Sequence, residues 1–184
     1  FLGQFAHQVL PAVFVLYAGY RYGYGETMVG LTLGFVGICS GVVQGLLIGP
    51  VVKRCGERLA LIVGLLFGAL GMAIYGLAPS GPLFWIGIPV MALWGLTGPA
   101  TMAIMSRLVS PSEQGQLASA NTSLASIAGL VAPGVFAVSF ARSLHDVPGM
   151  PFLLAAATLL LAAIIAWAVT GPLTGPRPAD GPAR

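Results

Sequence analysis

The amino-acid sequence predicts an all-α integral membrane protein with six transmembrane helices. Of its 184 residues, 57% are hydrophobic and only 7% are charged, whereas soluble domains carry about 25% charged residues. The apolar residues form long uncharged runs, and one membrane span needs about 20 mostly apolar residues. Because the charged residues gather in short turns between these runs, we expect lipid to surround the protein.

The first three predicted spans cover 1–19, 27–52 and 59–78. The first ends at the loop Tyr20–Glu26, whose tyrosines suit the aromatic belt of a membrane interface. The charged turn Lys53–Arg58 separates the second span from the third. It holds four charged residues, out of a total of eight basic and five acidic residues in the chain. The third span ends at the Pro- and Gly-rich turn Pro79–Pro82.

The last three predicted spans cover 83–106, 115–140 and 151–169, so that 1–170 form one six-helix unit. Pro89 and Pro99 fall inside the fourth span. Membrane helices tolerate proline where neighbouring helices or water satisfy the freed carbonyl groups. The segment 171–184 is rich in Pro and Gly and is predicted to be a disordered cytoplasmic tail.

The distribution of Lys and Arg predicts that both ends of this unit lie in the cytoplasm. Two of these residues, Arg21 and Arg142, fall on one side of the membrane. The other side carries six, and basic residues concentrate on the cytoplasmic side: Lys53, Arg54, Arg58, Arg107, Arg177 and Arg184. The net charge of +3 is therefore assigned to loop anchors. No basic run alternates with aromatic residues, so we expect no nucleic-acid partner.

Polar side chains gather on particular faces of the predicted helices. Gln4, His7 and Gln8 share one face of the first span, at i, i+3 and i+4. Such a face is expected to turn away from lipid, towards the protein interior or a water-filled cavity. Similar faces in the second, fourth and fifth spans complete a set of seven candidate cavity-lining residues: Gln4, Gln8, Ser40, Gln44, Trp94, Thr101 and Asn121.

His7 is the one ionisable side chain that we place inside a predicted span. Imidazole exchanges protons at physiological pH, and an ionisable group within the membrane is a candidate for function. His7 is therefore a candidate for proton coupling. The alternative is a neutral histidine that is hydrogen-bonded to glutamine or backbone near the membrane interface.

Glycines and cysteines add two structural expectations. Gly37, Gly41, Gly45 and Gly49 repeat every four residues in the second span, which predicts a groove for close approach of another helix. This groove serves packing alone, or packing together with sliding between conformations. Cys39 and Cys55 are too far apart along one helix to form a disulfide.

The sequence contains none of the patterns expected of an enzyme. It has no zinc-ligand spacing, no phosphate-binding loop followed by lysine, and no plausible Ser/His/Asp set. We therefore expect no enzymatic activity, no metal site and no cofactor.

Three segments carry a resemblance to a known family. The run Gly49–Leu61 resembles the cytoplasmic loop between the eighth and ninth helices of major facilitator superfamily drug/proton antiporters. Ser106–Arg107 with Glu113–Leu117 resembles the connection between their tenth and eleventh helices, and Ser126–Pro133 is similar to their eleventh helix. Within that superfamily, the tetracycline-resistance efflux branch is the most similar. The resemblance covers nearly the whole chain, as the C-terminal half with helices seven to twelve.

The resemblance implies a twelve-helix bundle in which each half contains two three-helix inverted repeats. Helices seven, eight, ten and eleven would line a central cavity, while the plainer third and sixth spans of this chain would lie outside, against lipid. The charged turn would act as a cytoplasmic gating loop that contains Gly49, Pro50, Lys53, Arg54, Gly56 and Arg58. The tetracycline branch carries a histidine in its eighth helix where this chain has Ser40.

The expected function is proton-coupled efflux of lipophilic drugs, tetracycline-like or varied, across a bacterial inner membrane by alternating access. The implied partners are a missing N-terminal six-helix half, the drug, protons from the gradient that supplies the energy, and the lipid bilayer. Two alternatives remain open: a major facilitator transporter of a specific small metabolite, and a non-transporting membrane scaffold fragment.

Overall fold

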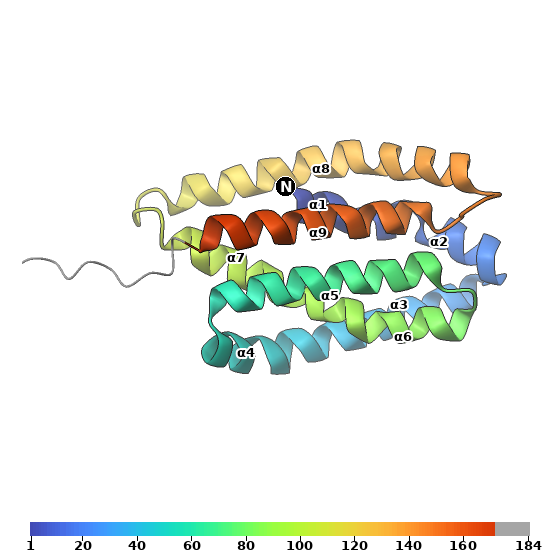
Figure 1. The fold of residues 1–184 in the computed structure, drawn as a ribbon, viewed down its shortest axis with the longest axis horizontal. Helices are drawn as coiled ribbons and strands as arrows, with labels where there is room; N and C mark the ends of the chain where they lie inside the picture. The colour runs from blue at the N-terminus through green and yellow to red at the C-terminus, as the bar shows by residue number, and fades with distance from the viewer. Residues whose placement is uncertain (172–184) are drawn as a thin grey trace, which may run out of the picture.

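The computed structural model describes residues 1–171, which form helices and contain no strand. The predicted tail, 171–184, lies outside the described residues apart from Gly171. The helices run side by side along one axis (Figure 1). Their bounds are α1 Leu2–His7, α2 Val9–Tyr22, α3 Glu26–Val42, α4 Ile48–Cys55, α5 Glu57–Leu77, α6 Gly81–Ala92, α7 Thr97–Ser106, α8 Gln114–Ser143 and α9 Met150–Thr170.

Five helical segments of the described chain are long and apolar enough to cross a membrane: Glu26–Cys55, Glu57–Leu77, Gly81–Ser106, Gln114–Ser143 and Met150–Thr170. They correspond to the last five predicted spans, with small shifts at their ends, such as Cys55 in place of Val52. The first predicted span, 1–19, contains the two shorter helices α1 and α2. The all-α fold is that of a partial membrane helix bundle.

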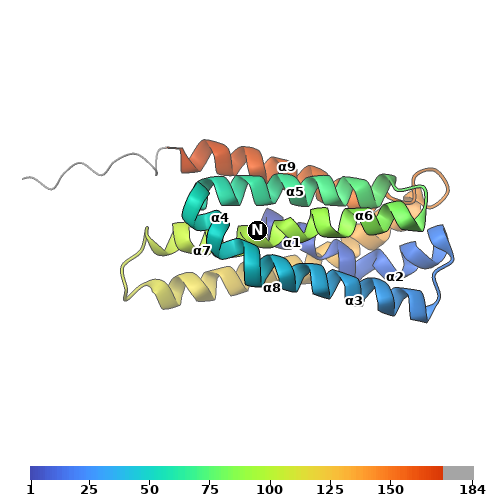
Figure 2. The same cartoon turned by 90° about the horizontal axis from the view of Figure 1, so that it is seen from below.

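The connections define two ends of the bundle. The turn between α4 and α5 at Gly56 and the connection between α7 and α8 lie together, and we call this the Gly56 end (Figure 1). The connections α2–α3, α5–α6 and α8–α9 lie at the opposite end, which carries a group of tyrosines and is called the tyrosine end. In both views α5 and α9 lie side by side along most of their length (Figures 1 and 2).

Proline explains the break between α1 and α2. Pro11 has no N–H to donate to the carbonyl of His7, and its ring crowds that carbonyl. The helical pattern is therefore interrupted at Gln8, whose N–H donates to the carbonyl of Phe5 at 3.2 Å. The helix resumes when the N–H of Ala12 donates to the carbonyl of Gln8 at 3.1 Å.

A second proline accompanies a wider helical turn in the segment Glu26–Cys55. Pro50 cannot donate to the carbonyl of Leu46, and the preceding segment Val43–Leu47 is a π-helix, in which the N–H of Ile48 donates to the carbonyl of Val43. The rod then continues as α4. Pro50 falls in the first turn of α4, where a missing N–H leaves no intrahelical bond of that helix unmade.

The charged turn predicted at Lys53–Arg58, part of the proposed gating loop, is shorter in the structure. Gly49, Pro50, Lys53 and Arg54 belong to α4, and Arg58 belongs to α5. Of the six residues only Gly56 lies outside a helix, with φ of 80° and ψ of 161°. A positive φ is readily adopted by glycine alone, so a single glycine reverses the chain and the flanking charged residues remain helical.

The rod Gly81–Ser106 is also interrupted. Its residues Leu93–Leu96 form a 3-10 helix between α6 and α7. Pro99 has no N–H for the carbonyl of Gly95. In the same segment the hydroxyl of Thr97 donates to the carbonyl of Trp94 at 2.9 Å. Pro89 and Pro133, by contrast, lie inside α6 and α8 without interrupting them.

The third predicted span, α5, has one exposed face and one face packed closely within the bundle. In α5 61% of the most apolar window is buried, against 11% for Glu26–Cys55. Leucines of α5 remain exposed on one face, but its glycines bring the other face close to its neighbours. A Cβ on Gly76 would lie 2.9 Å from the carbonyl oxygen of Gly149 at the start of α9, so the two backbones touch there.

The predicted glycine groove of the second span has no partner within the described chain. No atom outside the local helix lies within 4 Å of the Cβ positions built on Gly37, Gly41 or Gly45. Close helix packing therefore occurs at the glycines of α5, whose arrangement is less regular in the sequence.

Tyrosine hydroxyls complete the C-terminus of α5. The last carbonyls of a helix have no intrahelical donor, and Pro79 cannot supply one to Tyr75. The hydroxyl of Tyr17 donates to the carbonyl of Tyr75 at 2.8 Å, and the hydroxyl of Tyr22 donates to the carbonyl of Ala78 at 2.9 Å. The Tyr75 ring stacks on Phe84 at 4.2 Å. These contacts join α2, α5 and α6 into a closed tyrosine end.

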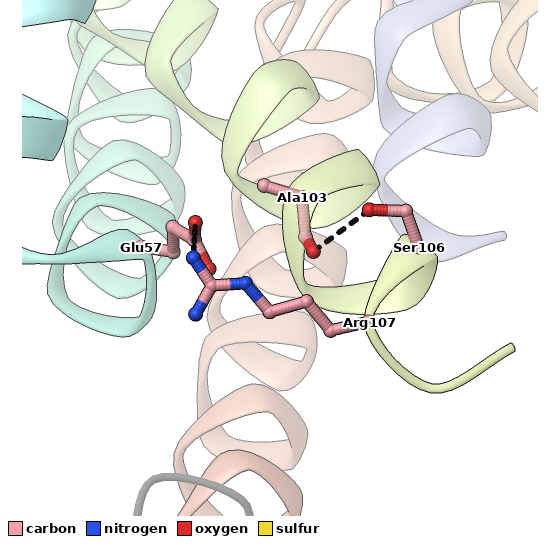
Figure 3. Close-up of polar contacts among 4 residues, drawn as sticks. All are labelled: Glu57, Ala103, Ser106 and Arg107. Carbon is pink, nitrogen blue, oxygen red and sulfur yellow. Dashed lines mark hydrogen bonds and ion pairs between the residues drawn. The ribbon is translucent and has the colours of Figure 1, made fainter.

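Charged side chains tie helices together at the Gly56 end. Arg107 forms an ion pair with Glu57, which joins the end of α7 to the start of α5 (Figure 3). Arg58 donates to the carbonyl of Trp167 and to the hydroxyl of Thr170, both at 3.1 Å, and its guanidinium lies 5.1 Å from the Trp167 ring. Arg58 therefore caps the C-terminus of α9.

A hydrogen-bonded turn precedes α8. The Ser110 hydroxyl and backbone N–H donate to one carboxylate oxygen of Glu113 at 2.7 and 3.0 Å. These bonds favour the ionised carboxylate and hold the pKa of Glu113 below its usual value. The negative charge next to the first residue of α8 also complements the helix dipole.

We predict that Tyr17→Phe destabilises the protein by about 1–2 kcal/mol, because a buried carbonyl loses its donor. The measurement is thermal unfolding of the detergent-solubilised full-length protein. Tyr20→Phe is the matched control, since Tyr20 is 52% exposed and its hydroxyl has no hydrogen bond to the described residues. Equal unfolding temperatures for the two variants would contradict the role of the Tyr17 hydroxyl.

We predict that Arg58→Lys lowers stability by about 1 kcal/mol, a value that allows for partial exposure. Lysine keeps the charge, but it has no planar group that could bond both Trp167 and Thr170 while it stacks on the Trp167 indole. The control is Arg54→Lys, an exposed residue with no ion pair to the described chain. Unfolding of both variants by heat provides the comparison, and a loss as large for Arg54→Lys would contradict the specific role of Arg58.

Candidate functional site

A cavity of about 900 Å³ lies among the helices in the part of the bundle nearer the Gly56 end. The lining residues show where the cavity lies along the bundle. Leu61 and Leu65 come from the start of α5, and the lining residues of α9, up to Thr170, come from the end of that helix. The tyrosine end beyond it is filled by aromatic side chains of the core. The cavity thus has one closed end and one end near the charged turns.

The structure brings most of the predicted polar residues together at this cavity. His7 and six of the seven candidate residues line it: Gln4, Ser40, Gln44, Trp94, Thr101 and Asn121. They come from α1, α3, the π-helix, the 3-10 helix, α7 and α8. Segments that are more than a hundred residues apart along the chain, such as those of Gln4 and Asn121, therefore face one space.

Gln8 is the candidate residue that does not line the cavity. A Cβ on Gly129 of α8 would lie 3.4 Å from its amide nitrogen, so Gln8 faces α8 instead. The break before Pro11 lies at Gln8 itself, where the backbone departs from regular α-helical bonding. The regular spacing from which its position was predicted does not continue through this residue.

The three interrupted helices meet the cavity at their irregular segments. His7 precedes the break at Gln8, Gln44 belongs to the π-helix, and Trp94 belongs to the 3-10 helix. The π-helix and the 3-10 helix contact each other, and the rings of His7 and Trp94 lie 5.4 Å apart. Irregular backbone at membrane depth is tolerated where it lines a cavity or is buried in protein.

The polar lining is made of neutral groups and one imidazole. Amides of Gln4, Gln44 and Asn121 both donate and accept hydrogen bonds, as the hydroxyls do. Among the described lining residues there is no Asp, Glu, Lys or Arg side chain. Chemically, this arrangement can hydrogen-bond an uncharged polar surface and surround an apolar or aromatic one.

Sequence reasoning did not predict several parts of the wall. Met91 and Met105 line the cavity, as do residues from Ala162 to Thr170 of α9, although the sixth span was expected to face lipid. The spacing of Met91 and Trp94, and of Met102 and Met105, is the signal that was available, since residues three apart share a helical face. Methionine adapts its shape to varied ligands.

No metal site is formed by the described residues, among which no group of three His, Cys, Asp or Glu side chains could hold an ion. Cys39 and Cys55 are both free thiols. The residues of the predicted gating loop do not line the cavity.

Comparison with known proteins is consistent with this architecture. Tetracycline resistance protein, class C, from Escherichia coli is 32% identical over 164 residues, which are 88% of this chain and 41% of that protein. The class E protein from the same organism is 29% identical over 165 residues, 90% of this chain and 41% of that protein. A proton-coupled folate transporter from Rattus norvegicus is 40% identical over 103 residues, 56% of this chain and 22% of that protein.

The chain therefore spans about two fifths of the length of the tetracycline resistance proteins that it matches. The family model of the Major Facilitator Superfamily matches residues 1–184. Members of that family are multi-pass membrane transporters of small molecules. From its helix bundle, its relatives and this match, the chain belongs to the major facilitator superfamily.

Proposed function

We propose that the full-length protein exports lipophilic drugs across a bacterial inner membrane in exchange for protons. In this proposal the described chain is its C-terminal half, helices seven to twelve. The observation that carries the proposal is the similarity to tetracycline resistance proteins over most of the chain, combined with a neutral polar cavity in the matching residues. The cavity size of about 900 Å³ is within the range of small-molecule sites.

The proposed mechanism is alternating access. The Gly56 end is taken as cytoplasmic, in agreement with the charge distribution of the loops. A drug would enter the cavity from this end, while the closed tyrosine end separates it from the outside. The N-terminal half would supply the opposite wall, and rocking of the two halves would expose the cavity to each side in turn. Drug and proton would favour opposite conformations.

His7 is proposed as a proton carrier of this half. Its ring contacts Trp94 at the cavity wall, so a change in its charge would be felt directly where a drug binds. Ser40 also lines the cavity, and it occupies the position at which the resemblance places a histidine in the tetracycline branch. In this proposal His7, one helix away, takes over that chemistry.

The missing half is proposed as an obligatory partner. Without it, the cavity face of this chain would turn polar groups such as Gln4 and Gln44 towards lipid. Each unpartnered polar group in hydrocarbon costs on the order of several kcal/mol. We therefore propose that the described half does not transport alone, and that it is not a scaffold module.

A second candidate function is transport of one specific small metabolite. The observation that favours it is the 40% identity to the folate transporter over 103 residues. The amide and hydroxyl groups of the cavity would then recognise a defined hydrogen-bonding pattern, and unrelated lipophilic drugs would be poor substrates.

We predict that cells expressing the full-length protein accumulate less tetracycline, and that an uncoupler abolishes the difference, because efflux loses its energy source. The measurement is cellular tetracycline with and without the uncoupler. Radiolabelled folate in a parallel assay tests the second candidate. Uncoupler-insensitive tetracycline levels together with proton-dependent folate uptake would overturn drug export in favour of metabolite transport.

We predict that His7→Gln abolishes proton movement evoked by drug, because glutamine can hydrogen-bond but does not exchange protons at physiological pH. Proton movement is followed in membrane vesicles with a pH-sensitive dye, and drug binding is measured separately. His145→Gln is the control, since His145 is exposed and does not line the cavity. Undiminished proton movement in His7→Gln would exclude His7 as the carrier.

A further inference from the structure

Trp94 lines the cavity, yet it is only 8% exposed. Its other side rests against α5, at Gly68. A Cβ on Gly68 would lie 2.8 Å from Cγ of Trp94 and 3.1 Å from both its Cβ and Cδ1. These are atoms at the base of the indole, which cannot move aside as the end of a flexible chain does. The space for Trp94 therefore exists because residue 68 has no side chain.

Two neighbouring contacts repeat this arrangement. A Cβ on Gly64 would lie 2.7 Å from Cγ2 of Thr97, and a Cβ on Gly71 would lie 2.5 Å from Cβ of Met91. Met91, Trp94 and Thr97 all line the cavity. Thus α5 supplies few lining side chains of its own, but its backbone supports three lining residues on and beside the 3-10 helix.

The ring of His7, another lining residue, lies 5.4 Å from the ring of Trp94. Trp94 therefore contacts the backbone of α5 at Gly68 and lies beside the candidate proton carrier at the cavity wall. A displacement of the indole away from α5 would change the shape of the cavity at this point.

We propose that Gly68 is a positioning residue that sets the depth of the Trp94 indole in the cavity, and thereby the size of ligand that the cavity accepts. The proposal rests on the function proposed above, since it assumes that the cavity binds a ligand. It makes Trp94 a specificity-determining residue of this wall. Gly68 touches no ligand and acts only through Trp94.

The consequence of Gly68→Ala follows from the distances. Close-packed interiors do not absorb an added methyl group without displacement of neighbours. The indole is then displaced away from residue 68, and the cavity narrows at that point. A larger ligand loses more favourable contacts than a smaller ligand of the same ring system.

The functional test uses full-length protein and two dyes with one ring system, proflavine and the larger acridine orange, which carries four additional methyl groups. We expect Gly68→Ala to lower the apparent affinity for acridine orange about tenfold, which is the scale of a misfit of one or two carbon atoms in a pocket. The apparent affinity for proflavine should change little. Gly134→Ala is the control, because no atom lies within 4 Å of a Cβ there and Gly134 does not line the cavity.

A double-mutant cycle separates positioning from general damage. In a Trp94→Ala background the indole is absent and only the 3.1 Å contact with Cβ of residue 94 remains, so Gly68→Ala should produce little further loss of size selectivity. Equal losses for both dyes, or the same additional loss in the Trp94→Ala background, would overturn the proposal.

A second measurement does not depend on transport. In protein labelled with 5-fluorotryptophan, the fluorine resonance of Trp94 is assigned as the one lost in Trp94→Phe. We expect Gly68→Ala to shift this resonance, His7→Ala to shift it as well, and Gly134→Ala to leave it in place. An unshifted resonance in Gly68→Ala overturns the positioning role. If the wild type moves neither dye but the resonance shifts, the proposed drug transport fails for these dyes while the positioning role stands.

Discussion

Backbone hydrogen bonding in an apolar medium is the constraint on which the rest of this structure depends. A carbonyl or N–H exposed to hydrocarbon has no water to bond, so the chain satisfies these groups within helices or with side chains. The Tyr17 hydroxyl illustrates this. Pro79 cannot donate to the carbonyl of Tyr75, and a tyrosine from another helix donates instead. The closure of the tyrosine end follows from completing one helix terminus.

The same constraint determines where irregular backbone can lie. Pro11, Pro50 and Pro99 each remove a donor from a membrane-length rod, and each is accompanied by a break, a π-helix or a 3-10 helix. The π-helix and the 3-10 helix contribute lining residues to the cavity, and so does His7, which directly precedes the break at Gln8. Carbonyl groups freed by proline are tolerated next to polar groups or water, so a polar cavity accommodates these irregularities.

Composition and spacing predicted the parts of the fold that depend on local pattern. Long apolar runs identified five of the rods, and polar faces identified His7 and six residues that line one cavity. The position of Gln8 could not be predicted, because the spacing argument assumes an unbroken helix and Pro11 breaks it. The extent of the charged loop was missed for a related reason: one glycine with positive φ reverses the chain at Gly56, and the charges beside it can remain helical.

The buried position of α5 depended on information that no single segment contains. In sequence, Gly64, Gly68 and Gly71 are small residues in an apolar run, and nothing local distinguishes packing against protein from exposure to lipid. Only with α6, the 3-10 helix and α7 in place does it become evident that a Cβ on each glycine would lie 2.5 to 2.8 Å from a cavity-lining residue. The missing side chains of α5 shape the cavity from behind. The polar residues that identify the site in the sequence and the glycines that set its dimensions therefore belong to different helices.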